Sequence, residues 1–243
     1  MSVKSQPQIE AYIGMTGSGK GVSINRRLAE LQPARLLVWD PRDEYDGHAR
    51  KVTTLAALVA DVKKAGAGPF RIRYVPDAKV KTEEAFGIVC RVAFAAGKLV
   101  FIAEELSDVT RPSWAPPAWK QIITQGRHQD LIVLGCCQRP ALVDKNFLGN
   151  ATMVRVFMLG YVEDSKAMAS AVRVKPEAID ALFTDEVEGG VDINFLQYTR
   201  RSRTLEAGHI RIRGNRVTEK LALYVASAPQ KSTVTGRTGR GAT

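Results

Sequence analysis

The sequence predicts an α/β fold in which a central, mostly parallel β-sheet lies between two layers of helices, as a three-layer sandwich. A glycine-rich turn joins a strand pattern to a helix pattern near the N-terminus. Short apolar runs then alternate with helical patterns, and several of the runs end in polar side chains. Alternation of this kind is typical of a parallel sheet whose ligands bind at the carboxyl ends of the strands.

The glycine-rich turn is the most specific signal. Residues 14–20, here called the phosphate loop, match the pattern G-x-x-x-x-G-K. Glycines let successive backbone N–H groups face an anion, and Lys20 adds a positive charge toward the β- and γ-phosphates. A helix that begins near Lys20 would also aim its N-terminus at them. The residues expected to bind a nucleotide are Gly14, Met15, Thr16, Gly17, Ser18, Gly19, Lys20, Gly21 and Val22.

Position 21 departs from the full pattern. The Ser or Thr that normally follows the lysine, and whose hydroxyl binds Mg²⁺, is Gly21. Ser23 lies two residues further on, about 200° around a helix, so it should point elsewhere. We therefore expect water molecules to replace the missing hydroxyl as Mg²⁺ ligands.

Two acids end the apolar run 99–105. In a parallel sheet this run would be buried on both faces, so Glu104 and Glu105 should emerge at the ligand-binding edge. We expect Glu104 to hold Mg²⁺, directly or through water, and Glu105 to orient and deprotonate an attacking water. The alternative is a strand end with two solvated acids.

A second buried run, 131–137, ends in Gln138-Arg139-Pro140. A glutamine at this place can sense the γ-phosphate or the attacking water. The alternative is a glutamine that only fills a strand-to-loop turn.

The other elements follow from periodicity. Further strands are expected at 35–40, 70–75 and 153–159, and helices at 55–64, 82–97, 119–125, 165–172 and 176–183. Strands at 195–199 and 209–213 should form an antiparallel hairpin at the sheet edge, joined by a basic connection. The residues expected to contact nucleic acid in this basic region are Arg200, Arg201, Arg203, Arg211 and Arg213.

Composition agrees with a polyanionic partner. Lys and Arg number 35 against 25 Asp and Glu, a net charge of +10. A solvated basic surface is the alternative reading. Cys90, Cys136 and Cys137 lie in apolar runs and are expected to be buried free thiols. Neither a membrane span nor a signal peptide is expected, and the chain should form one domain, 1–226, followed by a basic disordered tail, 227–243.

Together these elements resemble the HerA/FtsK-type superfamily of P-loop ATPases, within the additional-strand-with-catalytic-glutamate group, whose fold is RecA-like. The matching segments are the phosphate loop, Trp39-Asp40-Pro41-Arg42-Asp43-Glu44-Tyr45, Glu104-Glu105, and Gly126-Arg127-His128 through Gln138-Arg139-Pro140. They cover about residues 9–161. In size the chain is most similar to the genome-packaging ATPases of tailless icosahedral phages with an internal membrane.

The resemblance implies ATP hydrolysis to ADP and phosphate, with Mg²⁺, coupled to movement of double-stranded DNA through a hexameric ring. It also implies a site completed by an arginine of the neighbouring subunit, for which Arg127 is the first candidate, Arg139 the second and Arg155 the third. Capsid-vertex or membrane proteins are the implied partners, and the host cytoplasm or the virion packaging vertex is the implied location.

Three alternatives remain open from the sequence. A Zot-like phage assembly or export ATPase shares the phosphate loop and the Arg-His and Gln-Arg-Pro segments, but such proteins usually carry a membrane span. Nucleoside monophosphate kinases also place glycine after the lysine, although an arginine-rich lid is not evident here. A DNA-associated structural protein with a vestigial loop would explain Gly21 and the glutamate at position 104, where aspartate is commoner.

Overall fold

The computed structural model describes residues 8–77 and 79–225, which form one sheet with helices on both faces. Seven of its strands run parallel to their neighbours. In order across the sheet they are β7 (Met153–Val156), β1 (Gln8–Ile13), β6 (Ile132–Cys137), β5 (Val100–Ala103), β2 (Arg35–Trp39), β4 (Phe70–Tyr74) and β3 (Arg50–Val52). The expected mostly parallel central sheet is therefore confirmed.

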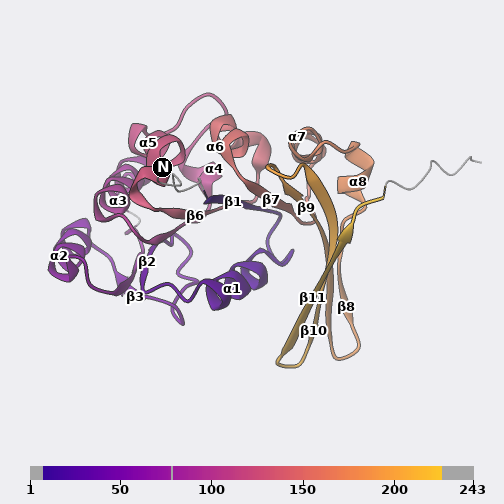
Figure 1. Cartoon of the computed structure of the whole chain (residues 1–243), viewed down its shortest axis with the longest axis horizontal. Helices are drawn as coiled ribbons and strands as arrows, with labels where there is room; N and C mark the ends of the chain where they lie inside the picture. Colours follow the sequence, from indigo (N-terminus) through magenta and orange to yellow (C-terminus); the bar gives the residue numbers. More distant parts are fainter. Residues whose placement is uncertain (1–7, 78, 226–243) are drawn as a thin grey trace, which may run out of the picture.

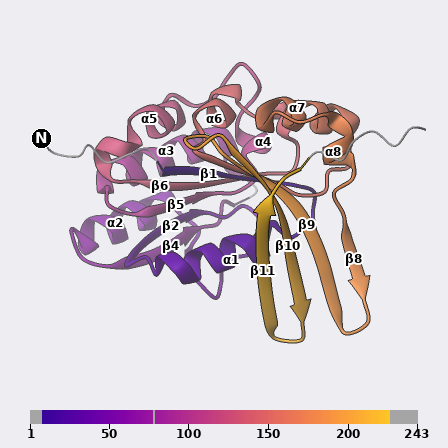
Figure 2. The same cartoon turned by 45° about the vertical axis from the view of Figure 1, so that its right-hand side comes forward.

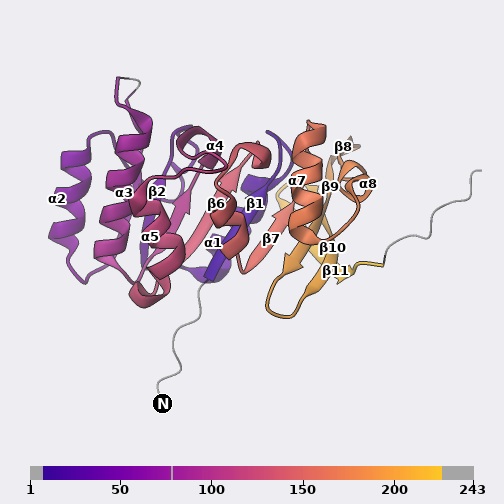
Figure 3. The same ribbon diagram turned by 90° about the horizontal axis from the view of Figure 1, so that it is seen from above.

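The helices form the outer layers, as Figures 1 and 3 show from two directions. Helix α1 (Lys20–Leu31) covers one face of the sheet. The opposite face carries α2 (Leu55–Ala65), α3 (Thr82–Ala96), α5 (Pro117–Gln125), α6 (Lys145–Asn150) and α7 (Val162–Val172). Shorter helices are α4 (Leu106–Val109) and α8 (Pro176–Asp180), with 3₁₀ turns η1 (Gly126–Gln129) and η2 (Pro140–Leu142).

Two apolar cores hold the layers together. The larger lies on the side of α3 and α5, where the rings of Trp39, Phe86, Trp119 and Phe147 follow one another at centroid distances of 5.2, 5.5 and 5.6 Å. The smaller lies under α1. Because the central strands are buried on both faces, their sequences read as continuous apolar runs, which is why they were predictable.

An antiparallel extension, here called the arm, continues the sheet beyond β7. It contains β8 (Thr184–Val187), β9 (Gly190–Thr199), β10 (Thr204–Arg213) and β11 (Arg216–Leu223). Only the last part of β9 pairs with β7, so the rest of the arm projects past the sheet, as Figure 2 shows. The predicted edge hairpin is present, but it is longer than expected and has two additional strands.

The arm corrects one expectation about charge. From the sequence, the arginines at 200–203 and those at 211–213 were expected to form one basic region. The turn at 200–203 joins β9 to β10 at one end of the hairpin, whereas Arg213 pairs with Gly190 at the other. Ten-residue strands separate the two groups by about 30 Å. They are therefore two separate groups of basic residues.

Several short elements were not predicted, namely β3, β8, β11, α4 and α6, none of them longer than eight residues. Segments of this length show too little periodicity to be recognised. All three cysteines are free and buried, as expected. No helix within the described ranges is long and apolar enough to cross a membrane. The predicted disordered tail, 227–243, lies outside the described residues.

Close packing between two strands of the arm requires a glycine beneath an aromatic ring. A Cβ at Gly208 would overlap the ring of Phe195, which lies opposite it in the neighbouring strand. We expect Gly208→Ala to lower the free energy of unfolding by about 2 kcal/mol through overpacking, and the melting temperature by several degrees. The control is Gly149→Ala in α6, where no atom lies within 4 Å of the added carbon. Equal melting temperatures for the two variants would contradict this account.

Candidate nucleotide site

The phosphate loop lies between β1 and α1, at the carboxyl edge of the parallel sheet. Two of its glycines are required by the backbone, since φ is 76° at Gly17 and 107° at Gly19, angles that other residues rarely adopt. The Lys20 ammonium donates to the carbonyls of Gly14 at 2.6 Å and Met15 at 3.0 Å. The Lys20 side chain therefore lies over the phosphate loop, where it is expected to contact bound phosphates.

The loop has the features of an anion site. Helix α1 has no side-chain N-cap and no acidic residue in its first turn. Its first N–H groups therefore stay available for an outside acceptor. Ser18 is 1% exposed, and its hydroxyl has no hydrogen-bond partner in the described structure. An unpaired buried donor beside free helix N–H groups fits a bound phosphate.

The two acids that follow β5 are both buried, Glu104 at 6% and Glu105 at 5% exposure. The alternative of solvated acids at a strand end is therefore wrong. The carboxylate of Glu104 accepts a hydrogen bond from the hydroxyl of Tyr45. Burial raises the pKa of Glu104 most, the Tyr45 and Cys136 donors oppose this, and the neighbouring charge of Glu105 raises it further.

Gln138 connects the phosphate loop to Glu105. It follows β6, which lies between β1 and β5 in the sheet although it comes after both in sequence. The amide oxygen of Gln138 accepts a hydrogen bond from Thr16 Oγ1 at 2.9 Å, and the amide nitrogen donates to Glu105. Glu105 itself has φ 48°, a left-handed conformation that costs about 1–2 kcal/mol and turns the chain into α4.

Asp40 organises a turn that was not predicted to belong to the site. It is fully buried and accepts hydrogen bonds from the backbone N–H of Glu44 at 2.9 Å and of Tyr45 at 3.1 Å. Arg73 on β4 donates to the same carboxylate at 3.1 Å. This turn holds Tyr45 against Glu104. The acid at the end of a buried strand was visible in the sequence, but a contact across 59 residues was not.

The first two arginines expected to complete the site of a neighbouring subunit lie in different parts of the fold. Arg127 is exposed in η1, just before β6, and so at the edge of the sheet opposite the phosphate loop of its own chain. Arg139 donates to the buried Asp164 at 2.7 Å and lies 3.8 Å over the ring of Tyr161.

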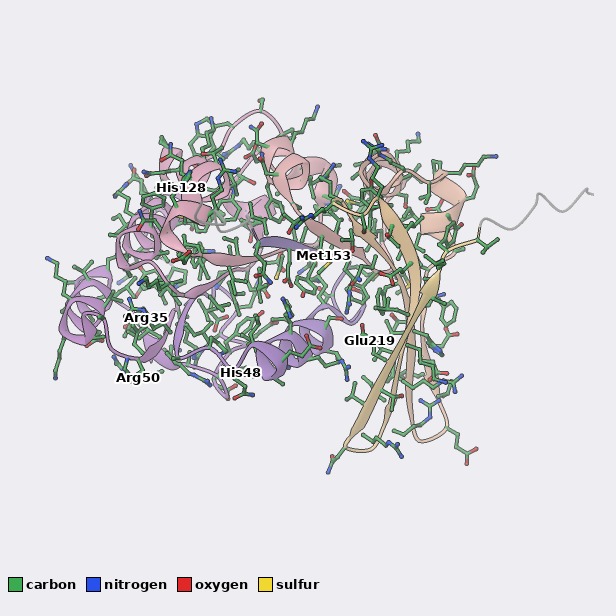
Figure 4. All side chains as sticks on the ribbon, viewed as in Figure 1. Arg35, His48, Arg50, His128, Met153 and Glu219 are labelled. Carbon is green, nitrogen blue, oxygen red and sulfur yellow. The ribbon has the colours of Figure 1, made fainter. Side chains whose placement is uncertain are left out.

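Arg155 has a structural role. It is buried and forms an ion pair with Glu219 at 2.9 Å, and it donates to Ser23. Ser23 therefore points away from the phosphate loop, as expected. Arg26 of α1 also pairs with Glu219, which Figure 4 shows on the arm where it faces α1. These contacts fasten the arm to α1, so we set Arg155 aside as a candidate for a neighbour's site.

The arm also touches the phosphate loop directly. Thr184 at the start of β8 donates to the carbonyl of Ser18 at 3.3 Å. A Cβ at Gly19 would come within 2.9 Å of the Ile193 side chain, so β9 packs against the loop. One side of the phosphate loop is therefore formed by the arm.

The five arginines proposed for nucleic acid differ in their contacts. Arg200 donates to the backbone carbonyls of Ala151 and Leu148, both at 2.9 Å, which is a structural role. Arg213 pairs with Asp192 at 2.7 Å, and Arg211 lies 3.9 Å from the same acid. Arg201 and Arg203 are exposed at the opposite end of the arm.

A groove of about 840 Å³ lies elsewhere, between α8 and the arm, and contains none of these site residues. Within residues 8–77 and 79–225, no cluster of three or more His, Cys, Asp or Glu side chains could hold a metal ion. A magnesium ion here would therefore depend on Glu104, phosphate oxygens and water, which is the usual way in which proteins hold Mg²⁺ with a nucleotide.

A glycine-rich loop between β1 and α1, buried acids after β5, and β6 inserted between these two strands together define a P-loop NTPase fold. No protein-family model matches the chain. Among curated proteins, it is 33% identical over 140 residues to "Protein P9" of Pseudoalteromonas phage PM2, which covers 56% of this chain and 62% of that protein. The match thus spans less than two thirds of the length of P9.

Solved structures agree on the fold. The genome-packaging NTPase B204 of Sulfolobus turreted icosahedral virus 2, in complex with AMPPCP, matches with a TM-score of 0.64 at 16% identity, over 82% of this chain and 96% of B204. B204 of Sulfolobus turreted icosahedral virus, a DNA-packaging ATPase, matches with a TM-score of 0.58 at 17% identity, over 83% and 97%. The predicted fold class, and the resemblance to viral packaging ATPases at the level of fold, are confirmed.

The buried Arg73–Asp40 pair offers a test of how the site is built. Replacing Arg73 by Met leaves a fully buried carboxylate without its cation, so we expect the free energy of unfolding to fall by about 3 kcal/mol. Arg50→Met is the control, because Arg50 pairs with Asp61 at the surface and its loss should cost at most about 1 kcal/mol. Urea denaturation measures both. Similar losses for the two variants would contradict the anchoring role of Asp40.

Proposed function

We propose that the chain is an ATPase that hydrolyses ATP to ADP and phosphate and uses the reaction to move double-stranded DNA, as a viral genome-packaging ATPase. The observation that carries the proposal is the path from Thr16 through Gln138 to Glu105, which joins a phosphate loop to a buried carboxylate. Binding of a phosphate and activation of a water would be coupled along this path.

The chemistry assigned to the site is in-line hydrolysis. The backbone of the phosphate loop and Lys20 bind the phosphates and neutralise their charge. Glu105 orients a water and takes its proton as the water oxygen bonds to the γ-phosphorus and the bond to the β–γ bridging oxygen breaks. Gln138, which contacts both the loop and Glu105, would report whether a γ-phosphate is present.

Glu104 is the residue proposed to hold Mg²⁺. It is buried, and no ion pair to it forms among the described side chains. A buried carboxylate without a protein counterion is costly unless a cation accompanies it. When bound, the ion would neutralise charge on the phosphate oxygens.

We propose that the site is completed in a hexameric ring by an arginine of the neighbouring subunit. Arg127 stays the first candidate because it is exposed and lies away from its own phosphate loop. Arg139 is the second, although its pairing with Asp164 would have to break before it could reach a neighbour.

Double-stranded DNA is the proposed substrate for movement. Duplex DNA carries about one negative charge per 1.7 Å, and arginines that contact phosphates bind it without reading sequence. Arg201 and Arg203 at one end of the arm, and Arg211 and Arg213 at the other, are the proposed contacts, while the bonds of Arg200 favour a structural role. Capsid-vertex or membrane proteins are the proposed partners, in the host cytoplasm or at the virion packaging vertex.

The central experiment measures phosphate release from ATP with and without double-stranded DNA. We expect DNA to stimulate release by the unaltered chain, and both Lys20→Ala and Glu105→Gln to lower the rate by at least about 100-fold. Glu105→Gln should keep its affinity for ATP, because that side chain acts on water and not on binding. Lys20→Ala should lose affinity as well.

Each alternative outcome has a distinct meaning. ADP formed from ATP and AMP without phosphate release would indicate a nucleotide kinase. DNA binding with no turnover under any condition would indicate a DNA-associated structural protein. ATP hydrolysis that DNA does not stimulate would contradict the translocase and leave an assembly or export ATPase.

DNA binding can be tested separately from hydrolysis. We expect Arg203→Gln and Arg211→Gln each to weaken duplex binding several-fold, equally for unrelated sequences, and to reduce the slope of log K against log salt by about one. Arg50→Gln is the control, since Arg50 lies on β3 at the far side of the sheet from the arm, as Figure 4 shows. Fluorescence anisotropy over a range of salt concentrations measures all three variants. An equal loss for Arg50→Gln would contradict the assigned surface.

A further inference from the structure

The hydrogen bond between Tyr45 and Glu104 brings a hydroxyl to the carboxylate proposed to hold the metal. Position 21, which normally supplies a Ser or Thr to the metal, is glycine in this chain. Tyr45, from the turn after β2, is 4% exposed, and its hydroxyl donates to Oε1 of the carboxylate proposed to hold the metal. A hydroxyl is thus present in the site, but it comes from another part of the chain.

The glycine at position 21 is not required by the fold. It lies in α1 with no positive φ, and no atom lies within 4 Å of a Cβ added there. The position is also exposed. A serine would therefore fit without displacing its neighbours, so packing does not explain why the usual hydroxyl is missing.

Tyr45, in contrast, is held firmly. The Asp40 carboxylate binds its backbone N–H at 3.1 Å, and the same carboxylate is anchored by the buried Arg73. Because the backbone of the turn is fixed and the Tyr45 side chain is buried, the phenol is held against Glu104.

A second tyrosine–glutamate pair differs from Tyr45 and Glu104 in whether the carboxylate also forms an ion pair. Tyr12 donates to Glu10 at 2.8 Å, but Glu10 also forms an ion pair with Arg27 at 2.7 Å. That carboxylate is neutralised within the chain. Glu104 has the tyrosine but forms no ion pair among the described residues, which is the arrangement expected of a carboxylate oriented for an external cation.

We propose that Tyr45 is a positioning residue that compensates for the hydroxyl missing at position 21, by fixing the Glu104 carboxylate for Mg²⁺ held with the nucleotide. The glutamate, one methylene longer than the commoner aspartate, is long enough to reach the phenol. This inference rests on the proposed nucleotide site. It assigns to Tyr45 no contact with the metal or the phosphates.

The test measures how nucleotide binding depends on Mg²⁺, in the absence of ATP hydrolysis. Calorimetry with a nonhydrolysable ATP analogue, in EDTA and over a range of Mg²⁺ concentrations, gives the nucleotide affinity and the Mg²⁺ concentration at half-maximal effect. We expect Tyr45→Phe to leave affinity in EDTA unchanged and to raise the half-maximal Mg²⁺ concentration about tenfold. Adding Gly21→Ser to Tyr45→Phe should restore most of this loss, because it supplies the usual hydroxyl.

Tyr12→Phe is the matched control. It removes a buried hydroxyl from another glutamate, so its Mg²⁺ curve should coincide with that of the unaltered chain. If Tyr45→Phe does not fold, Glu104→Asp tests the same contact from the other side, since the shorter carboxylate loses the phenol. Its Mg²⁺ requirement should rise and should again be restored by Gly21→Ser.

The outcomes separate the two proposals. If the unaltered chain binds no nucleotide, the proposed function is wrong and the role of Tyr45 is wrong with it. If binding is normal and Tyr45→Phe has an unchanged Mg²⁺ curve, or loses affinity equally in EDTA, only the role of Tyr45 is overturned. Failure of Gly21→Ser to restore the Mg²⁺ response would also overturn it.

Discussion

The parallel register of β1, β6 and β5 is the constraint on which the site depends. Ile13 at the end of β1 is level with Cys137 of β6, and Ala103 at the end of β5 is level with Gly135. The phosphate loop, Gln138 and the two glutamates therefore leave the sheet at nearly the same height. Since side chains alternate along a strand, a slip of one residue in either pairing would turn these groups to the wrong face.

Much of this arrangement could be predicted from the sequence. The apolar runs identified the central strands, and the polar residues that end them identified the edge at which they meet. The glycine pattern marked the phosphate loop because few local sequences satisfy its backbone angles. These signals come from short stretches of sequence, so they can be recognised without knowing which residues are neighbours in the fold.

The parts that escaped prediction depend on distant contacts. The contact of Tyr45 with Glu104 joins two turns that the sheet order alone brings together. The arm was underestimated because its outer strands carry charges that read as loop. Arg155 was a candidate for a neighbour's site and Arg200 for nucleic acid, whereas their guanidinium groups bind partners inside the chain. Charge in a sequence shows which residues can bind an anion, and only packing shows which of them are free to do so.

The contact between the arm and the phosphate loop has a mechanical consequence. Ser18 and Gly19 meet Thr184 and Ile193 at the base of the arm, and its hairpin tips lie further out. From Ile193, which contacts the loop, to Gly190 at the tip the strand extends about 10 Å, so a rotation of about 5° at that contact would move the tip by about 1 Å. A displacement of the phosphate loop would therefore be passed through Thr184 and Ile193 to the outer end of the arm.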